Sequence, residues 1–321
     1  KTVLSTTLLI FIIALFFVWL AANLITEAAT RLAKAWGMSE SFVGMTVVAL
    51  GTSFPEITLS VTGAIKSLHG QDSSAIVVGN AIGASMNQLI LVVAISGLLK
   101  VIRFKKKNVF FNAAFVILAA LLFYLFSRDG FIARLEGLSL LIFYSFYVFY
   151  SSRQNFLAQM GEKIKNKLTR KKMRWFDLAK LLFGLVMIVQ ASQIVLTKGV
   201  DLAMQLGISE ATVGIVLLGF GVSLPELVIA ITAALKGSRD LSMGNLVGGT
   251  IVNIAVAMAL GASISGWQVE RGLVQFDIPY LLFSVIIVVL FIGSRNKLDK
   301  KESLLLLSLY LVYISLKAIN I

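Results

Sequence analysis

The fold of this chain is decided by two copies of one short stretch, GTSFPE at residues 51–56 and GVSLPE at residues 221–226. Each copy places a proline and a glutamate inside a long apolar run. A proline inside a helix removes a backbone hydrogen bond and clashes with the preceding turn, and a glutamate in hydrocarbon is costly unless it meets a partner or a cation. Because both costs fall at matched positions, the pair predicts a binding site where two interrupted helices meet inside a membrane.

The composition is that of a protein embedded in a membrane. The chain has 321 residues, of which 58% are hydrophobic and 14% charged, whereas a soluble domain has about a quarter of its residues charged. Apolar runs of about twenty residues recur, each long enough to cross a bilayer as a helix. The lack of cysteine excludes disulfides and thiolate metal sites. The sequence therefore predicts an all-α membrane protein surrounded by lipid.

Ten membrane-spanning helices are predicted, over residues 3–30, 41–65, 72–99, 108–126, 135–152, 176–197, 209–235, 240–265, 274–294 and 303–316. Most Lys and Arg lie in the loops after the odd-numbered helices, and the alternate loops hold only Lys66, Arg128, Arg134, Lys198 and Arg271. Cytoplasmic loops carry such an excess, so both termini are expected outside. The net charge of +13 has the same origin and does not indicate a nucleic-acid partner.

The two halves of the chain contain the same sequence blocks. Residues 41–65 align without a gap on residues 211–235, which pairs Pro55 with Pro225 and Glu56 with Glu226. A second block, GNAIG at 79–83, returns as GNLVG at 244–248. Self-similarity at this scale indicates a duplicated structural unit.

The position of the longest loop fixes how the two units are related. Five predicted helices precede the basic segment 153–175, which we expect to be a partly helical cytoplasmic linker, and five follow it. An odd number of helices per unit forces the second unit to enter the membrane upside down. The expected architecture is thus two inverted five-helix repeats, residues 1–152 and 176–321, as in secondary transporters.

The repeated stretch offers oxygen atoms to a cation. Thr52 and Ser53 lie four and three positions before Glu56, on one face of a helix, and Ser223 stands in the same relation to Glu226. Two more oxygens come from the carbonyls of Gly51 and Gly221, to which the prolines cannot donate. The two copies facing each other would form an oxygen cage with two negative charges.

The chemistry of this cage favours calcium. Ca2+ takes six to eight oxygen ligands in irregular geometry, whereas Mg2+ demands a tighter octahedron and gives up its water reluctantly. Soft metals prefer Cys or His, and the sole histidine, His69, lies near a loop. The alternative for a single intramembrane glutamate is a structural hydrogen bond to a neighbouring helix, but two at the same repeat position favour a site.

Side chains after the second block would complete the cage. Gln88 and Asn253 occupy equivalent places and offer amide oxygens, with helix–helix hydrogen bonding as the alternative. Ser85 and Thr250 are weaker candidates, because such hydroxyls often bond back to their own helix. Three further acids, Asp129, Asp201 and Asp277, fall near predicted span ends and are expected to be exposed.

Over residues 37–95 and 207–260 the duplicated blocks resemble the alpha repeats of the calcium/cation antiporter superfamily. The proline-containing form is most similar to its sodium/calcium exchanger branch. The resemblance implies a ten-helix fold with alternating access to a central site for Ca2+ and Na+. It also implies glutamate ligands at Glu56 and Glu226 and hydroxyl ligands at Thr52, Ser53 and Ser223.

This chain departs from the family pattern at several positions. Val222 stands where a threonine is usual, although the family also uses the carbonyl of that residue. Ala84 and Gly249 replace serines, and Gln88 and Asn253 stand where an asparagine and an aspartate or asparagine are expected. The resemblance implies that the Ca2+ site, built on two carboxylates, survives these changes, whereas the Na+ sites lose hydroxyls.

The sequence therefore predicts a secondary antiporter that exchanges Ca2+ for Na+, without catalytic residues. It is expected in a prokaryotic plasma membrane, with the lipid bilayer and transported cations as partners and no obligate protein partner. An H+/Ca2+ or other divalent cation antiporter of the same fold is the first alternative, although the proton-coupled branch usually lacks this proline motif. A channel and a membrane-embedded acid–base enzyme are more remote, because interrupted helices favour a carrier and acid–base pairs need dissimilar environments.

Overall fold

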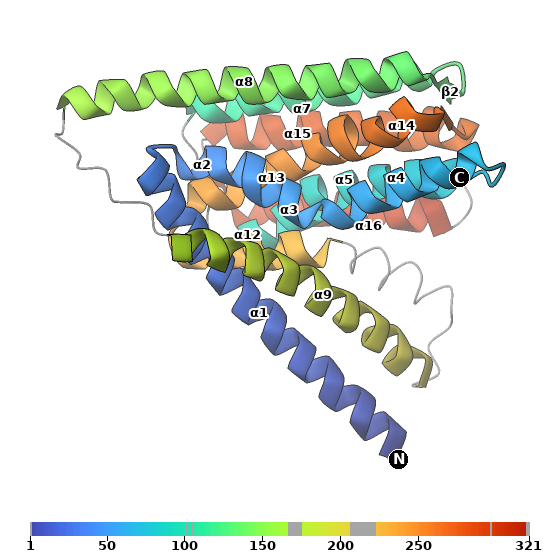
Figure 1. Cartoon of the computed structure of the whole chain (residues 1–321), viewed down its shortest axis with the longest axis horizontal. Coiled ribbons are helices and arrows are strands. Elements are labelled where there is room, and N and C mark those ends of the chain that lie inside the picture. The colour runs from blue at the N-terminus through green and yellow to red at the C-terminus, as the bar shows by residue number, and fades with distance from the viewer. Residues whose placement is uncertain are drawn as a thin grey trace.

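The computed structural model describes residues 2–99, 102–103, 106–165, 175–205, 223–295 and 297–318. Within these ranges the chain is helical almost throughout (Figure 1). The predicted ligands Gly221 and Val222, and the first part of the span predicted at 209–235, lie outside the described residues.

The first half of the chain contains α1 (Thr2–Trp36), α2 (Glu40–Val43), η1 (Gly44–Val48), α3 (Ala49–Thr52), α4 (Phe54–Leu68), α5 (Ser74–Met86), η2 (Asn87–Val92), α6 (Val93–Leu99), α7 (Lys106–Ser127) and α8 (Arg134–Lys165). The second half contains α9 (Trp175–Gln205), α12 (Leu224–Leu235), α13 (Arg239–Val252), η4 (Asn253–Met258), α14 (Ala259–Ser265), η5 (Leu273–Asp277), α15 (Ile278–Arg295) and α16 (Lys300–Ala318). Elements marked η are π-helical.

Two short antiparallel strand pairs join the loops of the two halves. Strand β1 (Ile102–Arg103) pairs with β4 (Lys297–Leu298), and β2 (Phe131–Ile132) pairs with β3 (Trp267–Gln268). Each pair connects a loop of the first half to a loop of the second, so the pairs tie the two halves together at loops outside the helices.

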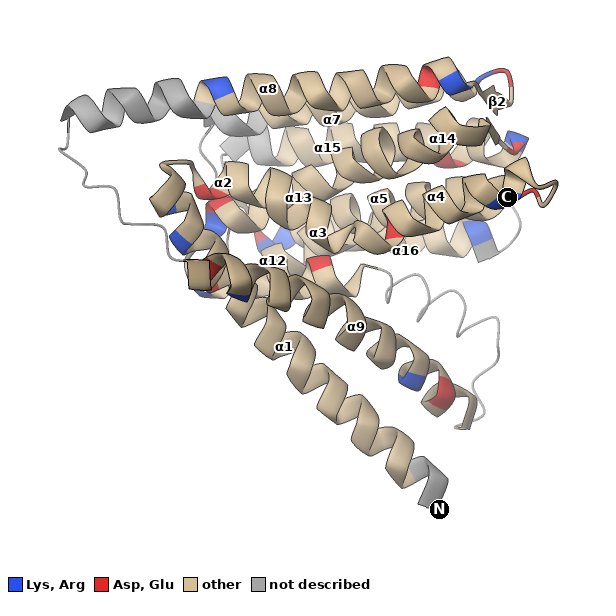
Figure 2. Ribbon diagram, in the orientation of Figure 1, with Lys and Arg blue, Asp and Glu red and all other residues tan. Residues whose placement is uncertain are grey.

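The helices confirm an all-helical membrane protein. Among the described residues, five helices are long and apolar enough to cross a membrane, and a sixth span results if the bent pair 40–52 and 54–68 counts as one. Shorter apolar helices cover 111–127 and 224–235. Figure 2 shows charged residues gathered near helix ends, with most helical surface uncharged. This distribution suits lipid, which offers no partner to an exposed charge.

The proline stretch interrupts its helix as predicted. The axes of the helices over 40–52 and 54–68 differ by 49°, and the break falls at Ser53, directly before Phe54 and Pro55. A proline is one of the few causes of a sharp helix bend. The π-helical segment η1 lies in the first repeated block, and η2 and η4 directly follow the helices that carry the two GN blocks. Such segments are frequent at functional sites.

Two hydrophobic clusters hold the bundle together. The larger one includes residues of α5, η2, α13, η4, α14, α15 and α16, and the smaller one joins α1, α9 and α12. Helices α1 and α9 pack along each other and lie obliquely to the remaining helices (Figure 1). The α1–α9 pair contacts the bundle at the break regions, through α3 and α12.

Glycines bring the two repeated blocks into direct contact. A Cβ on Gly44 of η1 would lie 2.6 Å from the carbonyl oxygen of Leu241 in α13. A Cβ on Gly244 would meet the Ser41 carbonyl, and one on Gly248 would meet the Met45 carbonyl. Small residues permit such close helix approach in membranes. As a result, the first copy of the proline block packs on the second copy of the GN block.

Candidate cation site

The two proline breaks have the same local geometry. Ser53 precedes α4 with φ −83° and ψ 11°, and Ser223 precedes α12 with φ −94° and ψ 12°. A serine at this position normally accepts a hydrogen bond from the first turn of its helix. Neither serine does so, and each buried hydroxyl lacks a hydrogen-bond partner among the described residues. Both hydroxyls are therefore free to face a ligand.

Each break places its glutamate in the first turn of the following helix. Glu56 is 5% exposed and Glu226 is 0% exposed, and the two carboxyls lie close enough for their charges to interact. Among the described residues, Oε2 of Glu56 and both carboxylate oxygens of Glu226 have no hydrogen-bond partner. An uncompensated buried charge costs several kcal/mol, so two neighbouring buried carboxylates need a cation or protons to neutralise them.

Other predicted residues surround these carboxylates. Thr52 and Gln88 lie close to the Glu226 carboxyl, although neither makes a hydrogen bond of good geometry to it. The Thr52 hydroxyl donates to the Ala49 carbonyl at 3.2 Å, which leaves its lone pairs available. A Cβ on Gly51 would lie 2.6 Å from a methyl carbon of Leu185, so glycine at 51 lets α9 approach the break.

The second block contributes a small polar network. Oε1 of Gln88 accepts hydrogen bonds from the Thr250 hydroxyl and from Nδ2 of Asn253, both at 3.4 Å. The single Thr250 hydroxyl proton is shared with the Leu246 carbonyl, which lies nearer, at 3.1 Å. Ser85 donates to the Ala81 carbonyl at 2.8 Å, the local bond expected as its alternative role. Oδ1 of Asn253 is buried without a partner among the described residues.

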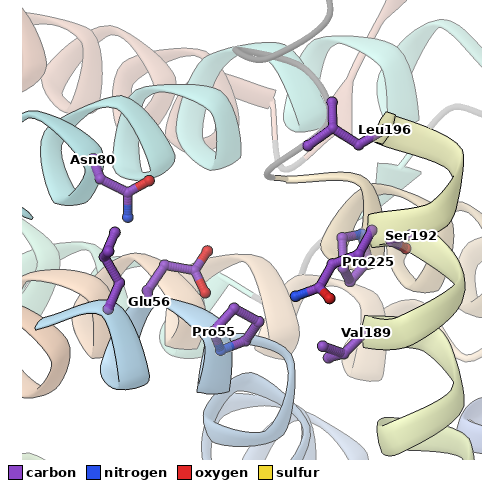
Figure 3. Close-up of a pocket in the computed structure, with 9 residues that line it drawn as sticks. Pro55, Glu56, Asn80, Val189, Ser192, Leu196 and Pro225 are labelled. Carbon is purple, nitrogen blue, oxygen red and sulfur yellow. The ribbon is translucent and has the colours of Figure 1, made fainter. Parts of the chain in front are cut away.

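A cavity of about 270 Å³ leads to Glu56 from the side of α9. It is lined by Pro55, Glu56, Leu59, Asn80, Val189, Ser192, Gln193, Leu196 and Pro225. Figure 3 shows the Glu56 carboxylate between Asn80 of α5 and Pro225 at the start of α12. The cavity gives the carboxylate a route to the outside of the bundle, whereas Glu226 is fully enclosed.

Sequence reasoning missed three polar residues of this cavity. Asn80 belongs to the repeated GN block, and its counterpart Asn245 is fully buried with both amide atoms unpartnered among the described residues. The recurrence of asparagine at this position of both GN blocks could have identified Asn80 as a candidate site residue. Ser192 and Gln193 lie on α9, outside the repeated blocks, so no pattern marked them.

Among the described residues, no group of three His, Cys, Asp or Glu side chains exists that could hold a metal. The site therefore combines two carboxylates with neutral oxygens from hydroxyls, amides and backbone. All of these are hard ligands of the kind that Ca2+ and Na+ prefer to sulfur or imidazole. The donor set fits such an ion as a transported substrate.

One expectation about acidic residues was wrong. Asp277 is buried rather than exposed. It accepts hydrogen bonds from the Tyr313 hydroxyl at 2.7 Å and from Nζ of Lys317 at 2.9 Å. The sequence did not predict this burial, because Asp277 lies at a predicted span end and its partners come from α16, which contacts it only in the folded bundle.

Comparison with known proteins places the chain among ion exchangers. The family model described as sodium/calcium exchanger protein matches residues 6–153 and 177–318. The putative antiporter CaxA of Alkalimonas amylolytica is 26% identical, over 97% of this chain and 98% of its own. The sodium/calcium exchanger MaX1 of Methanosarcina acetivorans is 25% identical, over 97% and 98%. A solved sodium/calcium exchanger from Methanococcus jannaschii has the same fold, with a TM-score of 0.79, 24% identity and coverage of 97% and 98%.

Proposed function

The chain belongs to the sodium/calcium exchanger family of membrane antiporters, and from that premise we propose that it exchanges Ca2+ for Na+ at the cage formed around Glu56 and Glu226. Its family and fold are those of transporters rather than enzymes. The observation that carries the proposal is the pair of buried, neighbouring carboxylates, three of whose four oxygens lack hydrogen-bond partners among the described residues. A divalent cation neutralises both charges at once.

The proposed ligands come from both repeats. The first repeat supplies Glu56, Ser53, Thr52 and the carbonyl of Gly51, and the second supplies Glu226 and Ser223, with the carbonyls of Gly221 and Val222 as further candidates outside the described residues. Asn253 adds an amide oxygen that has no partner among the described residues. Six to eight oxygens at irregular angles are what Ca2+ requires.

We propose that these ligands lie at the middle of a ten-helix bundle made of two inverted halves, residues 1–152 and 176–321. The near-identical backbone angles at Ser53 and Ser223 support this symmetry. So do the π-helical segments η2 and η4, which each begin at the end of a GN block helix. The basic linker 153–175 and both termini are proposed to lie on opposite sides of a prokaryotic plasma membrane.

Exchange follows from competition for one cage. Either one Ca2+ or Na+ ions can neutralise the two carboxylates, and the neutralised site tolerates the helix rearrangement that exposes it to the other side. An empty cage would keep two facing charges inside the bundle, which opposes that rearrangement. The ion-loaded protein can therefore expose its site to the other side of the membrane, whereas the protein with an empty site cannot. This difference is the requirement for antiport.

Proton coupling is the second candidate, because two buried carboxylates can also be neutralised by protons. The acid–base enzyme is a weaker alternative. Its two acids would need different environments, whereas Glu56 and Glu226 follow the same kind of break and each has at least one carboxylate oxygen without a hydrogen-bond partner among the described residues.

The test is radiolabelled Ca2+ uptake into proteoliposomes loaded with Na+, compared with vesicles that have only a pH gradient. We expect uptake driven by the Na+ gradient and its loss in Glu56→Gln and Glu226→Gln. Glu27→Gln is the matched control, since Glu27 pairs with Lys236 at 3.1 Å away from the cage. Uptake driven by pH alone would reassign the counter-ion, and no uptake under either gradient would refute calcium antiport.

A further inference from the structure

A second, polar cavity lies where the C-terminal end of α1 meets the turn between α12 and α13. Its volume is about 350 Å³, and it shares no described lining residue with the cavity beside Glu56. Three cations line it, Arg31, Lys34 and Lys236, whereas Glu27 is the one acid among its described lining residues. This surplus of positive charge repels a transported cation and attracts an anion.

The acids near these cations do not use up their hydrogen-bond donors. Glu27 lies 3.1 Å from Nζ of Lys236 and 3.9 Å from Nη2 of Arg31. Asp177 of α9 lies 3.5 Å from Nη1 of Arg31. A guanidinium has five N–H donors and an ammonium has three, so donors on both cations remain for a further acceptor. Lys34 has no ion pair at all among the described residues.

Two hydroxyls add a neutral donor to the cavity. The hydroxyls of Thr30 and Ser238 are joined by a hydrogen bond of 3.1 Å, in which only one of them donates. The other hydroxyl therefore keeps its proton for a further acceptor. Cationic donors together with a hydroxyl suit the oxygens of a phosphate group, and the planar fork of an arginine can bind two of those oxygens at once.

The surroundings place this cavity at the edge of the lipid-facing surface. Asp177, the partner of Arg31, lies in the first turn of α9, next to the basic linker. The neighbouring Trp175 and Phe176 are exposed, and so is Leu235, the last residue of α12. Exposed tryptophan is typical of the level at which lipid headgroups lie. A headgroup phosphate could therefore enter the cavity from the surrounding lipid.

The sequence repeat supplies these cations at one end of the bundle. When the gapless alignment of the two repeats is continued upstream, Arg31 corresponds to Asp201 and Lys34 to Met204. Asp201 accepts a hydrogen bond of 2.7 Å from Lys198 of its own helix. The cationic cavity thus lies at the end of the basic linker, which is the cytoplasmic side in the proposed topology. Anionic lipids give the cytoplasmic leaflet its negative surface potential.

We propose that the cavity formed by Arg31, Lys34, Lys236 and the Thr30–Ser238 pair binds a phosphate group, supplied by the headgroup of an anionic phospholipid or by a soluble phosphate. The bound phosphate joins the end of α1 to the turn between α12 and α13. The site uses no residue of the carboxylate cage, so this inference goes beyond the proposed Ca2+/Na+ exchange and does not depend on it.

The test is thermal unfolding of the purified protein in a neutral detergent and a Ca2+-free buffer, at constant ionic strength because salt screens exposed charges. Dioctanoyl phosphatidylglycerol, dioctanoyl phosphatidylcholine and inorganic phosphate are titrated separately. We expect a saturable rise in Tm with phosphatidylglycerol and none with phosphatidylcholine, whose choline group cancels the phosphate charge. A rise with phosphatidylglycerol alone identifies a lipid ligand, and a saturable rise with inorganic phosphate shows that the site accepts a soluble phosphate.

Lys34→Gln separates binding at this cavity from general attraction to a basic protein. The variant breaks no ion pair of the described residues, so its Tm without ligand should be unchanged. Its half-saturating phosphatidylglycerol concentration should rise about tenfold, the effect of losing one hydrogen bond to a charged group. Lys301→Gln is the matched control, because Lys301 is an exposed lysine outside the cavity. Glu27→Gln should lower the half-saturating concentration, since it removes an acid that competes with the phosphate.

Three results would overturn the inference. The first is the lack of a saturable response to both phosphatidylglycerol and inorganic phosphate. The second is equal weakening in Lys34→Gln and Lys301→Gln, which would mean that the ligand responds to net charge rather than to this cavity. The third is weaker binding in Glu27→Gln, because the ion pairs of Glu27 would then shape the protein without competing with a phosphate.

Discussion

The hydroxyl of Tyr310 in α16 donates a hydrogen bond of 2.7 Å to Oδ1 of Asn87, the residue directly before Gln88 in η2. This bond connects a helix near the C-terminus to the π-helical segment that carries a cage residue. Both side chains are buried, so water cannot replace either partner. The bond therefore fixes the start of η2 and, through it, the position of the Gln88 amide.

Tyr310→Phe should destabilise the protein by about 1–3 kcal/mol, the usual cost of leaving a buried acceptor without its donor. We also expect weaker Na+ activation of Ca2+ uptake, because η2 loses an anchor. Thermal unfolding and the Na+ concentration for half-maximal uptake measure the two effects. Tyr144→Phe is the matched control, since the buried Tyr144 hydroxyl has no partner among the described residues. Equal losses in both variants would contradict the anchoring role.

Ser53→Ala and Ser223→Ala should weaken Ca2+ binding with little loss of stability in the absence of ions. The reason is that neither hydroxyl caps its helix. Ser39→Ala should behave in the opposite way, because the Ser39 hydroxyl accepts a 3.1 Å hydrogen bond from the Phe42 backbone as a true N-cap. Its loss should cost about 1 kcal/mol and leave Ca2+ affinity unchanged. Thermal unfolding and equilibrium Ca2+ binding on the same samples distinguish the two classes.

Lys317→Ala should destabilise the protein by about 1–3 kcal/mol, less than a fully buried pair would lose, because Lys317 is 40% exposed and Tyr313 still donates to Asp277. Removing the charge of the acid as well, in Lys317→Ala with Asp277→Asn, should recover most of the loss. Thermal unfolding measures both variants. A double variant no more stable than the single one would mean that Lys317 acts by packing alone.

These contacts mark the limit of what the sequence could predict. Pro55 and Glu56 were identifiable because Pro225 and Glu226 repeat them, and the helix break at Ser53 follows from the local chemistry of proline. The contact between Gln88 and Gly249 depends on how η2 meets α13, which no local pattern encodes. The burial of Asp277 likewise depends on α16. The sequence therefore predicted the local helix break, whereas it did not predict contacts between side chains that are distant in the chain.

Gly44→Ala should disrupt the contact between η1 and α13. Its Cβ would lie 2.6 Å from the backbone oxygen of Leu241 and 3.0 Å from the backbone nitrogen of Asn245. Backbone atoms in a packed helix cannot rotate away as a side chain can, so we expect a loss of about 1–3 kcal/mol from overpacking. The separation of the two repeated blocks should also increase, which lowers Ca2+ affinity because ligands come from both.

Gly272→Ala serves as the control for that substitution, because a Cβ there meets nothing within 4 Å. Thermal unfolding and equilibrium Ca2+ binding should both be unchanged in this variant. Gly137→Ala tests whether overpacking at any tight glycine contact lowers Ca2+ affinity. Its Cβ would lie 2.6 Å from the Ser263 backbone nitrogen, at the contact between α8 and α14. It should lower stability without changing Ca2+ affinity. If Gly44→Ala and Gly137→Ala reduce affinity equally, the contact between the repeated blocks has no special role in holding the cage.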